Sequence, residues 1–178
     1  MLTEEAHDMR GGGQPKKNSA PNTPTPVQGN KVVFRVVSGP DQGMQFEVGK
    51  RTCRATGRAV GDPNKTSVLN VDVTLSIDSD TKGLILQYIQ GQFRRPQEGK
   101  AEAGDNQFGS FQRVSDVVFK DQTLSRLHAM IFFDDVGVGV LDLVSKNGTF
   151  VNGEEVESRL LKKGDTIELG ETKVVFEG

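Results

Sequence analysis

The chain has 178 residues, which is enough for one domain of ordinary size or for a smaller domain with tails. Its 22 Lys and Arg residues and 24 Asp and Glu residues give a formal net charge of -2, which argues against a general binder of nucleic acids, so any anion site must be local. The single cysteine excludes an internal disulfide, and no apolar run approaches the length of about 20 residues that spans a bilayer. Because the first ten residues also lack the features of a signal peptide, we expect a soluble, cytoplasmic protein without a membrane partner.

Residues 1–30 are predicted to form a disordered N-terminal tail. The stretch 11–30 has four glycines, four prolines and almost nothing apolar, so it cannot bury enough surface to offset the entropy of ordering. The tail carries three candidate phosphorylation sites. Thr23 and Thr25 each precede a proline, and Thr3 precedes two glutamates.

From residue 31 onward the chain consists of short β-like runs separated by glycine-rich turns. Strict alternation over 71–77 predicts a strand within 68–77, and 84–90 is predicted to return beside it as a β-hairpin. The polar stretch 96–110 is predicted to be a mobile loop. No segment keeps a 3.6-residue apolar period, so the pattern predicts an all-β sandwich. The other expected strands are 31–37, 44–49, 51–58, 114–119, 127–133, 137–144, 149–151 and two within 166–177.

Two Asn-Gly pairs lie close together in the stretch 143–153, LVSKNGTFVNG. Asn-Gly between extended segments is a strong signal for a tight hairpin turn, because both residues tolerate a positive φ. Only Thr149, Phe150 and Val151 separate the two pairs. Either one pair is a poor turn, or one of the two loops exists to hold a ligand.

The Ser, His, Asp and Cys residues of the chain do not form the pattern of a catalytic or metal site. Ser125 and His128 are three apart in a region that enters a strand, where they would point to opposite faces. Asp134 and Asp135 precede a glycine-rich turn and are expected to cap a loop. Cys53 is expected to be a buried core thiol, and no Cys/His spacing fits zinc. We therefore expect no enzyme activity, no cofactor and no metal.

Polar residues at several strand ends form a pattern that resembles the forkhead-associated (FHA) domain family. The pattern is Gly57-Arg58, then Ser125-Arg126-x-His128-Ala129, then Asn147-Gly148-Thr149-x-Val151-Asn152-Gly153, flanked by residues 115–119 and 161–170. The resemblance covers roughly 31–58 and 114–177. It implies a β-sandwich of about eleven strands that binds phosphothreonine peptides through loops at one end. The domain would then span 31–178, with an insertion at about 60–112.

The resemblance also implies a role for each matching residue. Arg58 is the expected principal phosphate ligand, and Ser125 the expected phosphate-bonding hydroxyl. The further expected roles are phosphate or peptide support by Arg126 and Lys146, peptide main-chain binding by Asn147 and Asn152, selection of a neighbouring peptide residue by Thr123, and structural roles for Gly57, His128 and Gly148.

One departure from the family pattern concerns the distance between Arg58 and Ser125. Residues 59–124 separate the two, where the family usually has a short strand and loop. The insertion could extend a sheet, cover a peptide, dock a partner, or have no role. It also leaves open whether Arg51 or Arg54, rather than Arg58, is the loop arginine.

Three functions follow from these expectations. The first is a phosphothreonine-dependent adaptor or sensor downstream of a Ser/Thr kinase. The second is a switch in which the domain binds its own phosphorylated tail, since about thirty flexible residues reach across a small domain at high effective concentration. The third is the regulatory head of a larger signalling enzyme.

Overall fold

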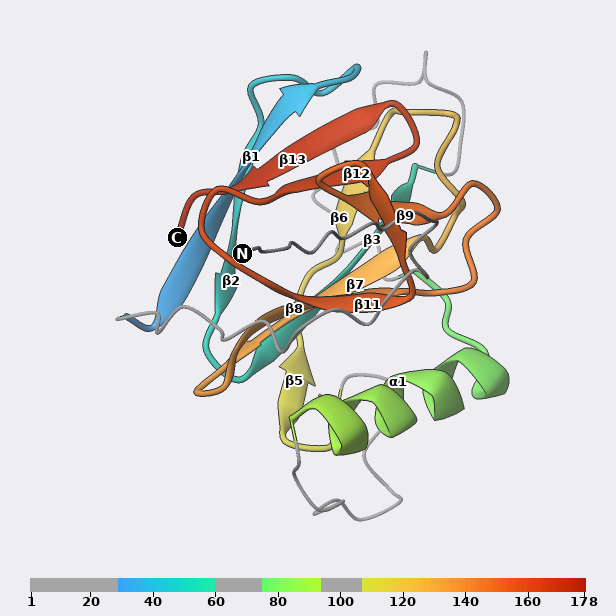
Figure 1. Cartoon of the computed structure of the whole chain (residues 1–178). Helices are drawn as coiled ribbons and strands as arrows, with labels where there is room; N and C mark the ends of the chain where they lie inside the picture. The colour runs from blue at the N-terminus through green and yellow to red at the C-terminus, as the bar shows by residue number, and fades with distance from the viewer. Residues whose placement is uncertain (1–28, 60–74, 94–106) are drawn as a thin grey trace, which may run out of the picture.

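A computed structural model describes residues 29–59, 75–93 and 107–178 of the chain. Two sheets pack face to face, and one helix lies against the outer side of one of them (Figure 1). The predicted all-β sandwich is thereby confirmed, with thirteen short strands among the described residues. The predicted tail lies outside the described residues except for its last two positions.

The first sheet, sheet A, has six strands in the order β10-β9-β12-β13-β1-β2. Both termini of the described sandwich meet here, because β1 pairs antiparallel with β13. The strands are β1 (Lys31–Ser38), β2 (Gln45–Gly49), β9 (Thr149–Val151), β10 (Glu154–Val156), β12 (Thr166–Leu169) and β13 (Thr172–Phe176).

The second sheet, sheet B, has seven strands and is built around β3. One side of β3 pairs antiparallel with β7, and its other side pairs in parallel with β5 at the start and β6 at the end. The order is β11-β8-β7-β3-β5-β4. The strands are β3 (Thr52–Arg58), β4 (Gln107–Phe108), β5 (Phe111–Arg113), β6 (Val117–Phe119), β7 (Ala129–Asp134), β8 (Gly137–Asp142) and β11 (Ser158–Leu161).

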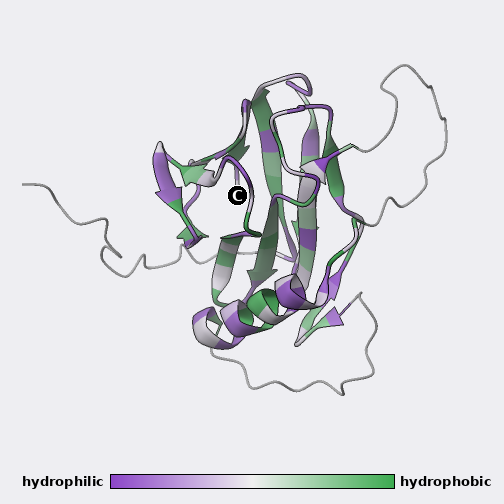
Figure 2. Ribbon diagram, turned by 90° about the vertical axis from the view of Figure 1, so that its right-hand side faces the viewer, coloured by the Kyte–Doolittle hydropathy of each residue, from purple (hydrophilic) through white to green (hydrophobic). Residues whose placement is uncertain are grey.

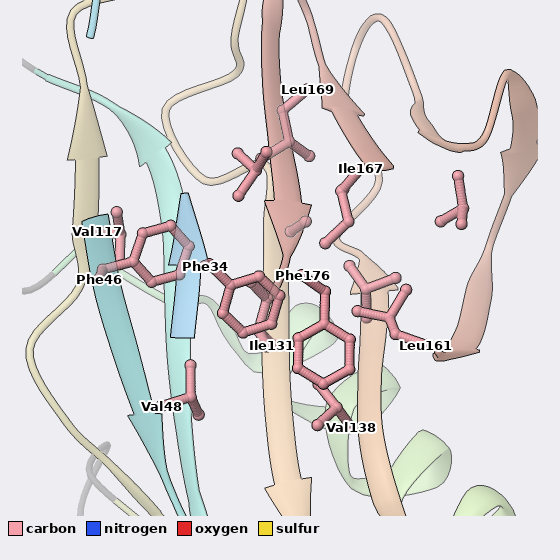
Figure 3. Close-up of a cluster of buried hydrophobic side chains, with 14 of the residues drawn as sticks. Phe34, Phe46, Val48, Val117, Ile131, Val138, Leu161, Ile167, Leu169 and Phe176 are labelled. Carbon is pink, nitrogen blue, oxygen red and sulfur yellow. The ribbon is translucent and has the colours of Figure 1, made fainter. Parts of the chain in front are cut away.

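The inner core fills the space between the sheets with aliphatic and phenylalanine side chains (Figure 3). Phe34 lies directly opposite Phe46 on one neighbouring strand and Phe176 on the other, and its ring stacks on both at centroid distances of 5.1 Å. Such cross-strand aromatic pairs help to fix the register of the strands, because a shift of one residue would turn these rings to solvent.

The predicted β-hairpin of 68–90 is wrong, because residues 79–92 form a helix, α1 (Ser79–Gln92). The Asp78 side chain caps its first turn by accepting a hydrogen bond from the Thr81 N–H at 2.7 Å. Ile85, Tyr88 and Ile89 are buried at a spacing that lies on one side of a helix, and polar and apolar stretches alternate along α1 in Figure 2. The predicted strand over 68–77 lies outside the described residues up to position 74, and residues 75–78 are not in a strand.

The buried side of α1 creates an outer core on the side of sheet B that faces away from sheet A (Figure 1). The Tyr88 and Phe111 rings pack on Phe132 of β7 at centroid distances of 5.2 and 5.3 Å. Sheet B is therefore covered on both sides, which explains why β7 is buried at every position. Its sequence, AMIFFD, is a nearly continuous apolar run, as is typical of such strands.

The prediction of a mobile loop over 96–110 is wrong at its C-terminal end. Residues 107 and 108 form β4, which returns through a turn to β5, and Phe108 is fully buried. The remainder of that prediction, up to residue 106, lies outside the described residues. The sequence pattern of this β4–β5 hairpin is weak because β4 has only two residues, too few to show alternation.

Candidate functional site

The candidate site begins at the end of β3 with Gly57 and Arg58. The Arg58 N–H donates to the Ser125 carbonyl at 3.0 Å, so the two loop residues are joined through their main chains. The guanidinium Nη1 donates to Gln122 Oε1 at 3.3 Å, whereas Nε is buried without a hydrogen-bond partner among the described residues. Arg58 thus keeps charged donors that the protein itself does not use.

Gly57 is a glycine because no side chain fits at this position. A Cβ atom here would lie 1.8 Å from the Arg126 carbonyl oxygen and 2.9 Å from a methyl carbon of Leu75. The strand that carries Arg58 and the loop that carries Ser125 can therefore approach only because residue 57 has no Cβ.

His128 is fully buried beneath the loops and joins two of them. Its Nδ1 accepts the Ser125 N–H at 3.1 Å, so the proton is on Nε2, which donates to the Gly148 carbonyl at 2.9 Å. Burial lowers the pKa of His128, against the opposing effect of the Gly148 carbonyl, so the ring is neutral at pH 7. His128 thus connects the Ser125 loop to the loop that contains Gly148.

The loop after β8 meets the Ser125 loop through two further hydrogen bonds. The Ser125 hydroxyl accepts the Lys146 N–H at 2.9 Å, and the Asn147 side-chain amide donates to the Thr123 carbonyl at 2.8 Å. Lys146 and Asn147 are exposed, and so is Arg126. The structure therefore brings Arg58, Ser125 and Asn147 to one end of the sandwich, together with the positive charges of Arg126 and Lys146.

The second Asn-Gly pair has a different environment. Asn152, at φ 53°, occupies the turn between β9 and β10. Its side chain donates to Asp165 Oδ1 at 2.9 Å and accepts the Thr166 N–H at 2.9 Å. Both ends of the amide therefore bind the turn before β12, on the neighbouring part of sheet A.

Two carboxylates that the sequence analysis did not identify shape the loops. Asp121 is buried and accepts hydrogen bonds from the Thr123 N–H and hydroxyl with one oxygen, and from the Glu171 N–H and the Thr172 hydroxyl with the other. Burial alone would raise the pKa of Asp121, but these hydrogen bonds outweigh it and hold the pKa below its ordinary value. The Thr123 hydroxyl is thus engaged within the protein, since it also accepts the Glu171 N–H at 2.9 Å.

The second carboxylate, Asp142, shapes the loop that carries Asn147. It accepts the Ser145 N–H at 3.1 Å and the Thr149 hydroxyl at 2.7 Å. In both loops an Asp stands two or three residues before a Thr or Ser whose N–H it binds. This Asx-turn pattern is visible in the sequence and could have identified both residues.

The alternative loop arginines lie elsewhere. Arg54, in the middle of β3, donates to the Ser115 carbonyl at 2.7 Å and the Glu47 carbonyl at 2.8 Å. Arg51 stands before the first residue of β3, at the opposite end from Arg58, and pairs with Asp135 at 3.8 Å. The main-chain hydrogen bond to Ser125 belongs to Arg58.

The geometry gives no support to a Ser–His catalytic pair. The main-chain N–H of Ser125, and not its hydroxyl, bonds to His128, so the ring is not placed to take the hydroxyl proton. Asp134 accepts the Val136 N–H at 2.7 Å and caps the turn before β8. Across residues 29–59, 75–93 and 107–178 there is no cluster of three or more His, Cys, Asp or Glu side chains that could hold a metal ion, and no helix with the length and apolar character to cross a membrane.

Val144, at the start of the Asn147 loop, has a strained backbone with φ 55° and is 80 % exposed. A β-branched residue in the left-handed region costs about 1–2 kcal/mol. Asparagine tolerates this conformation, so we expect Val144→Asn to raise the free energy of unfolding by about 1 kcal/mol in urea denaturation. The control is Val37→Asn, on the extended strand β1, which is expected to lower it. An equal decrease in the free energy of unfolding in both variants would show that the Val144 backbone is not strained.

Comparison with known proteins gives one family. Residues 106–170 match the FHA domain family. The chain is 40 % identical over 62 residues to the glycogen accumulation regulator GarA of Mycobacterium tuberculosis, covering 35 % of this chain and 38 % of GarA. It is 40 % identical over 62 residues to the oxoglutarate dehydrogenase inhibitor of Corynebacterium efficiens, covering 35 % of this chain and 44 % of that protein. The chain thus spans about two fifths of the length of these curated relatives.

The fold agrees with the sequence match. The solution structure of the FHA domain of an Arabidopsis thaliana hypothetical protein superposes with a TM-score of 0.50 and 20 % identity, covering 90 % of this chain and 93 % of that one. The matching segment, 106–170, contains the Ser125 and Asn147 loops, whereas Gly57 and Arg58 precede it. The predicted resemblance is confirmed: the chain carries the sequence motifs of an FHA domain in residues 106–170 and has the FHA fold.

Proposed function

We propose that this protein binds phosphothreonine-containing peptides at the end of the sandwich formed by Arg58, Ser125 and Asn147. The observation that carries the proposal is the state of Arg58. Its main chain is fixed to Ser125 at 3.0 Å, while its guanidinium keeps a buried, unpartnered Nε among the described residues. Only Nη1 of the guanidinium makes a hydrogen bond among the described residues, to Gln122 at 3.3 Å, so the group keeps charge and donors for an anionic ligand.

Each side chain supplies a different part of the recognition. A phosphate monoester carries roughly -1.5 to -2 charges at neutral pH, which a guanidinium fork can bind through two hydrogen bonds. The Ser125 hydroxyl already accepts from Lys146 and has its own proton left to donate to a phosphate oxygen. Arg126 and Lys146 add positive charge, and Asn147 can bond the main chain of an extended peptide.

We assign structural roles to two residues that the resemblance also suggested for binding. Asn152 stabilises the turn before β12, because its side-chain amide bonds Asp165 and Thr166. The Thr123 hydroxyl binds Asp121 and Glu171, which leaves its methyl group and main chain for contact with a peptide. Gly57, His128 and Gly148 hold the loops in place.

We further propose that the protein acts by binding rather than by catalysis, as an adaptor or sensor downstream of a Ser/Thr kinase. Its relatives are named as a regulator of glycogen accumulation and an inhibitor of oxoglutarate dehydrogenase, which supports a regulatory role. The ligand is a threonine phosphorylated in another protein or in the chain's own tail, at Thr3, Thr23 or Thr25.

The test is a degenerate phosphothreonine peptide library, probed with the full chain and compared with the same library after phosphatase treatment. Peptides covering each tail threonine, with and without phosphate, are included. We expect dissociation constants of about 1–100 μM for the best phosphopeptides and no binding after dephosphorylation, because the charge-assisted bonds supply most of the affinity. Equal binding before and after phosphatase treatment would refute the proposal.

A further inference from the structure

Leu75, within the insertion, lies beside the end of β3 that carries Arg58. Leu75 is the first described residue after the gap, and it is 5 % exposed. One of its methyl carbons lies 2.9 Å from the position that a Cβ on Gly57 would take. Leu75 therefore packs over the α-carbon next to Arg58, beside the Arg126 carbonyl that covers the same point.

A buried ion pair fixes the main chain of Leu75 in this position. The Leu75 N–H donates to Asp116 Oδ2, and its carbonyl accepts from Arg113 Nη2 at 2.7 Å. Arg113 and Asp116 bind each other at 2.7 and 3.2 Å, and their side chains are 2 % and 1 % exposed. Burying two charges is costly unless their hydrogen bonds are satisfied. Leu75 satisfies one on each partner, while Arg113 Nη1 is buried without a partner among the described residues.

The pair also ties Leu75 to the two strands that run parallel to β3. Arg113 ends β5, and Asp116 directly precedes β6, which runs parallel to β3 from Thr56 to Arg58. Leu75 and the ion pair thus link β5, beside the start of β3, to β6, beside its end.

We infer that Leu75 is a positioning residue for Arg58, so that this residue of the insertion supports the binding site. By covering Gly57, Leu75 holds the end of β3 against the Ser125 loop, and the position of the Arg58 side chain follows from where this main chain is held. This inference rests on the proposed function, because the purpose of positioning Arg58 is to meet a phosphate.

The test compares Leu75→Ala with Ile85→Ala, which removes the same number of atoms from the same outer core but from α1. Two quantities are measured: the dissociation constant for the best library phosphopeptide, and the exchange with solvent of the Arg58 Nε–H, followed by ¹⁵N NMR without ligand. We expect both variants to lose stability, and Leu75→Ala alone to weaken peptide binding by about tenfold and to expose Arg58 Nε–H. Leu75→Met should restore both readouts, and Leu75→Val replaces Leu75→Ala if the alanine variant does not fold.

The two readouts separate this inference from the proposed function. Equal effects of the Leu75 and Ile85 variants on affinity and on Arg58 exchange would overturn the positioning role. If no phosphopeptide binds the wild type, the proposed function fails and the NMR comparison decides alone: faster Arg58 exchange in the Leu75 variant only supports positioning, and unchanged exchange overturns it.

Discussion

Arg58→Ala is expected to lower the affinity for a phosphothreonine peptide by about two to four decades. Each charge-assisted hydrogen bond contributes about 1.5–3 kcal/mol, and the guanidinium can make two to a phosphate. The thermal midpoint should stay close to that of the wild type, because the side chain makes one hydrogen bond at 3.3 Å, to Gln122, and has a buried Nε without a partner in the described part of the chain. Isothermal titration calorimetry at fixed ionic strength measures the change.

Three variants show whether the loss belongs to the site. Arg35→Ala removes the same charge from β1, where the side chain pairs with Glu177 at 2.8 Å, and should leave affinity unchanged. Arg58→Lys keeps the charge but loses the paired N–H donors of the guanidinium. Its affinity for the peptide should lie between those of Arg58→Ala and the wild type. Ser125→Ala should weaken binding less than Arg58→Ala, since it removes a neutral hydroxyl. Wild-type affinity in Arg58→Ala would show that another residue holds the phosphate.

Gly57→Ala is expected to cost the largest amount of stability of any single methyl group added to this end of the sandwich. The new Cβ would lie 1.8 Å from the Arg126 carbonyl oxygen and 2.7 Å from its carbon, and both are main-chain atoms that cannot rotate away. Overpacking of this kind costs about 3 kcal/mol or more, and the displaced loop should also weaken phosphopeptide binding.

The matched control is Gly83→Ala in α1. A Cβ at Gly83 meets nothing within 4 Å, and alanine is about 1 kcal/mol better than glycine inside a helix. Urea denaturation should therefore show the two glycine-to-alanine changes moving the midpoint in opposite directions. A Gly57→Ala protein as stable as wild type would mean that the Arg126 loop moves freely and that the close approach is not required.

The sandwich and its loops were predictable because their signals are local. Alternating runs placed β1, β2 and β3 to within one residue, and the short strand between the two Asn-Gly pairs was placed at its observed ends. The order of the motif residues also led to Arg58, Ser125 and Asn147, which the structure brings to one end. Turn residues and strand alternation depend on neighbours in sequence, so they are visible before folding.

The helix was not predictable from the same signals. Residues 84–90, LILQYIQ, resemble a strand, and α1 also contains Gly83 and Gly91, which disfavour a helix. Its conformation is decided by the rings of Phe132 and Phe111 that lie beneath it, and these belong to strands distant in sequence. The contact of Leu75 with Arg113 and Asp116 was invisible for the same reason, since its partners lie 38 and 41 positions away.

The docking of α1 on sheet B gives the protein an optical reporter of its own. The chain has one tyrosine and no tryptophan, and that tyrosine is Tyr88, packed between Phe93 and Phe132. Burial raises the pKa of Tyr88 above its ordinary value, so the phenol stays protonated in alkaline solution while the helix is docked. Tyrosine fluorescence and the alkaline absorbance of tyrosinate therefore record one event, the seating of the insertion's helix on the sheet, with no background from the inner core or the loops.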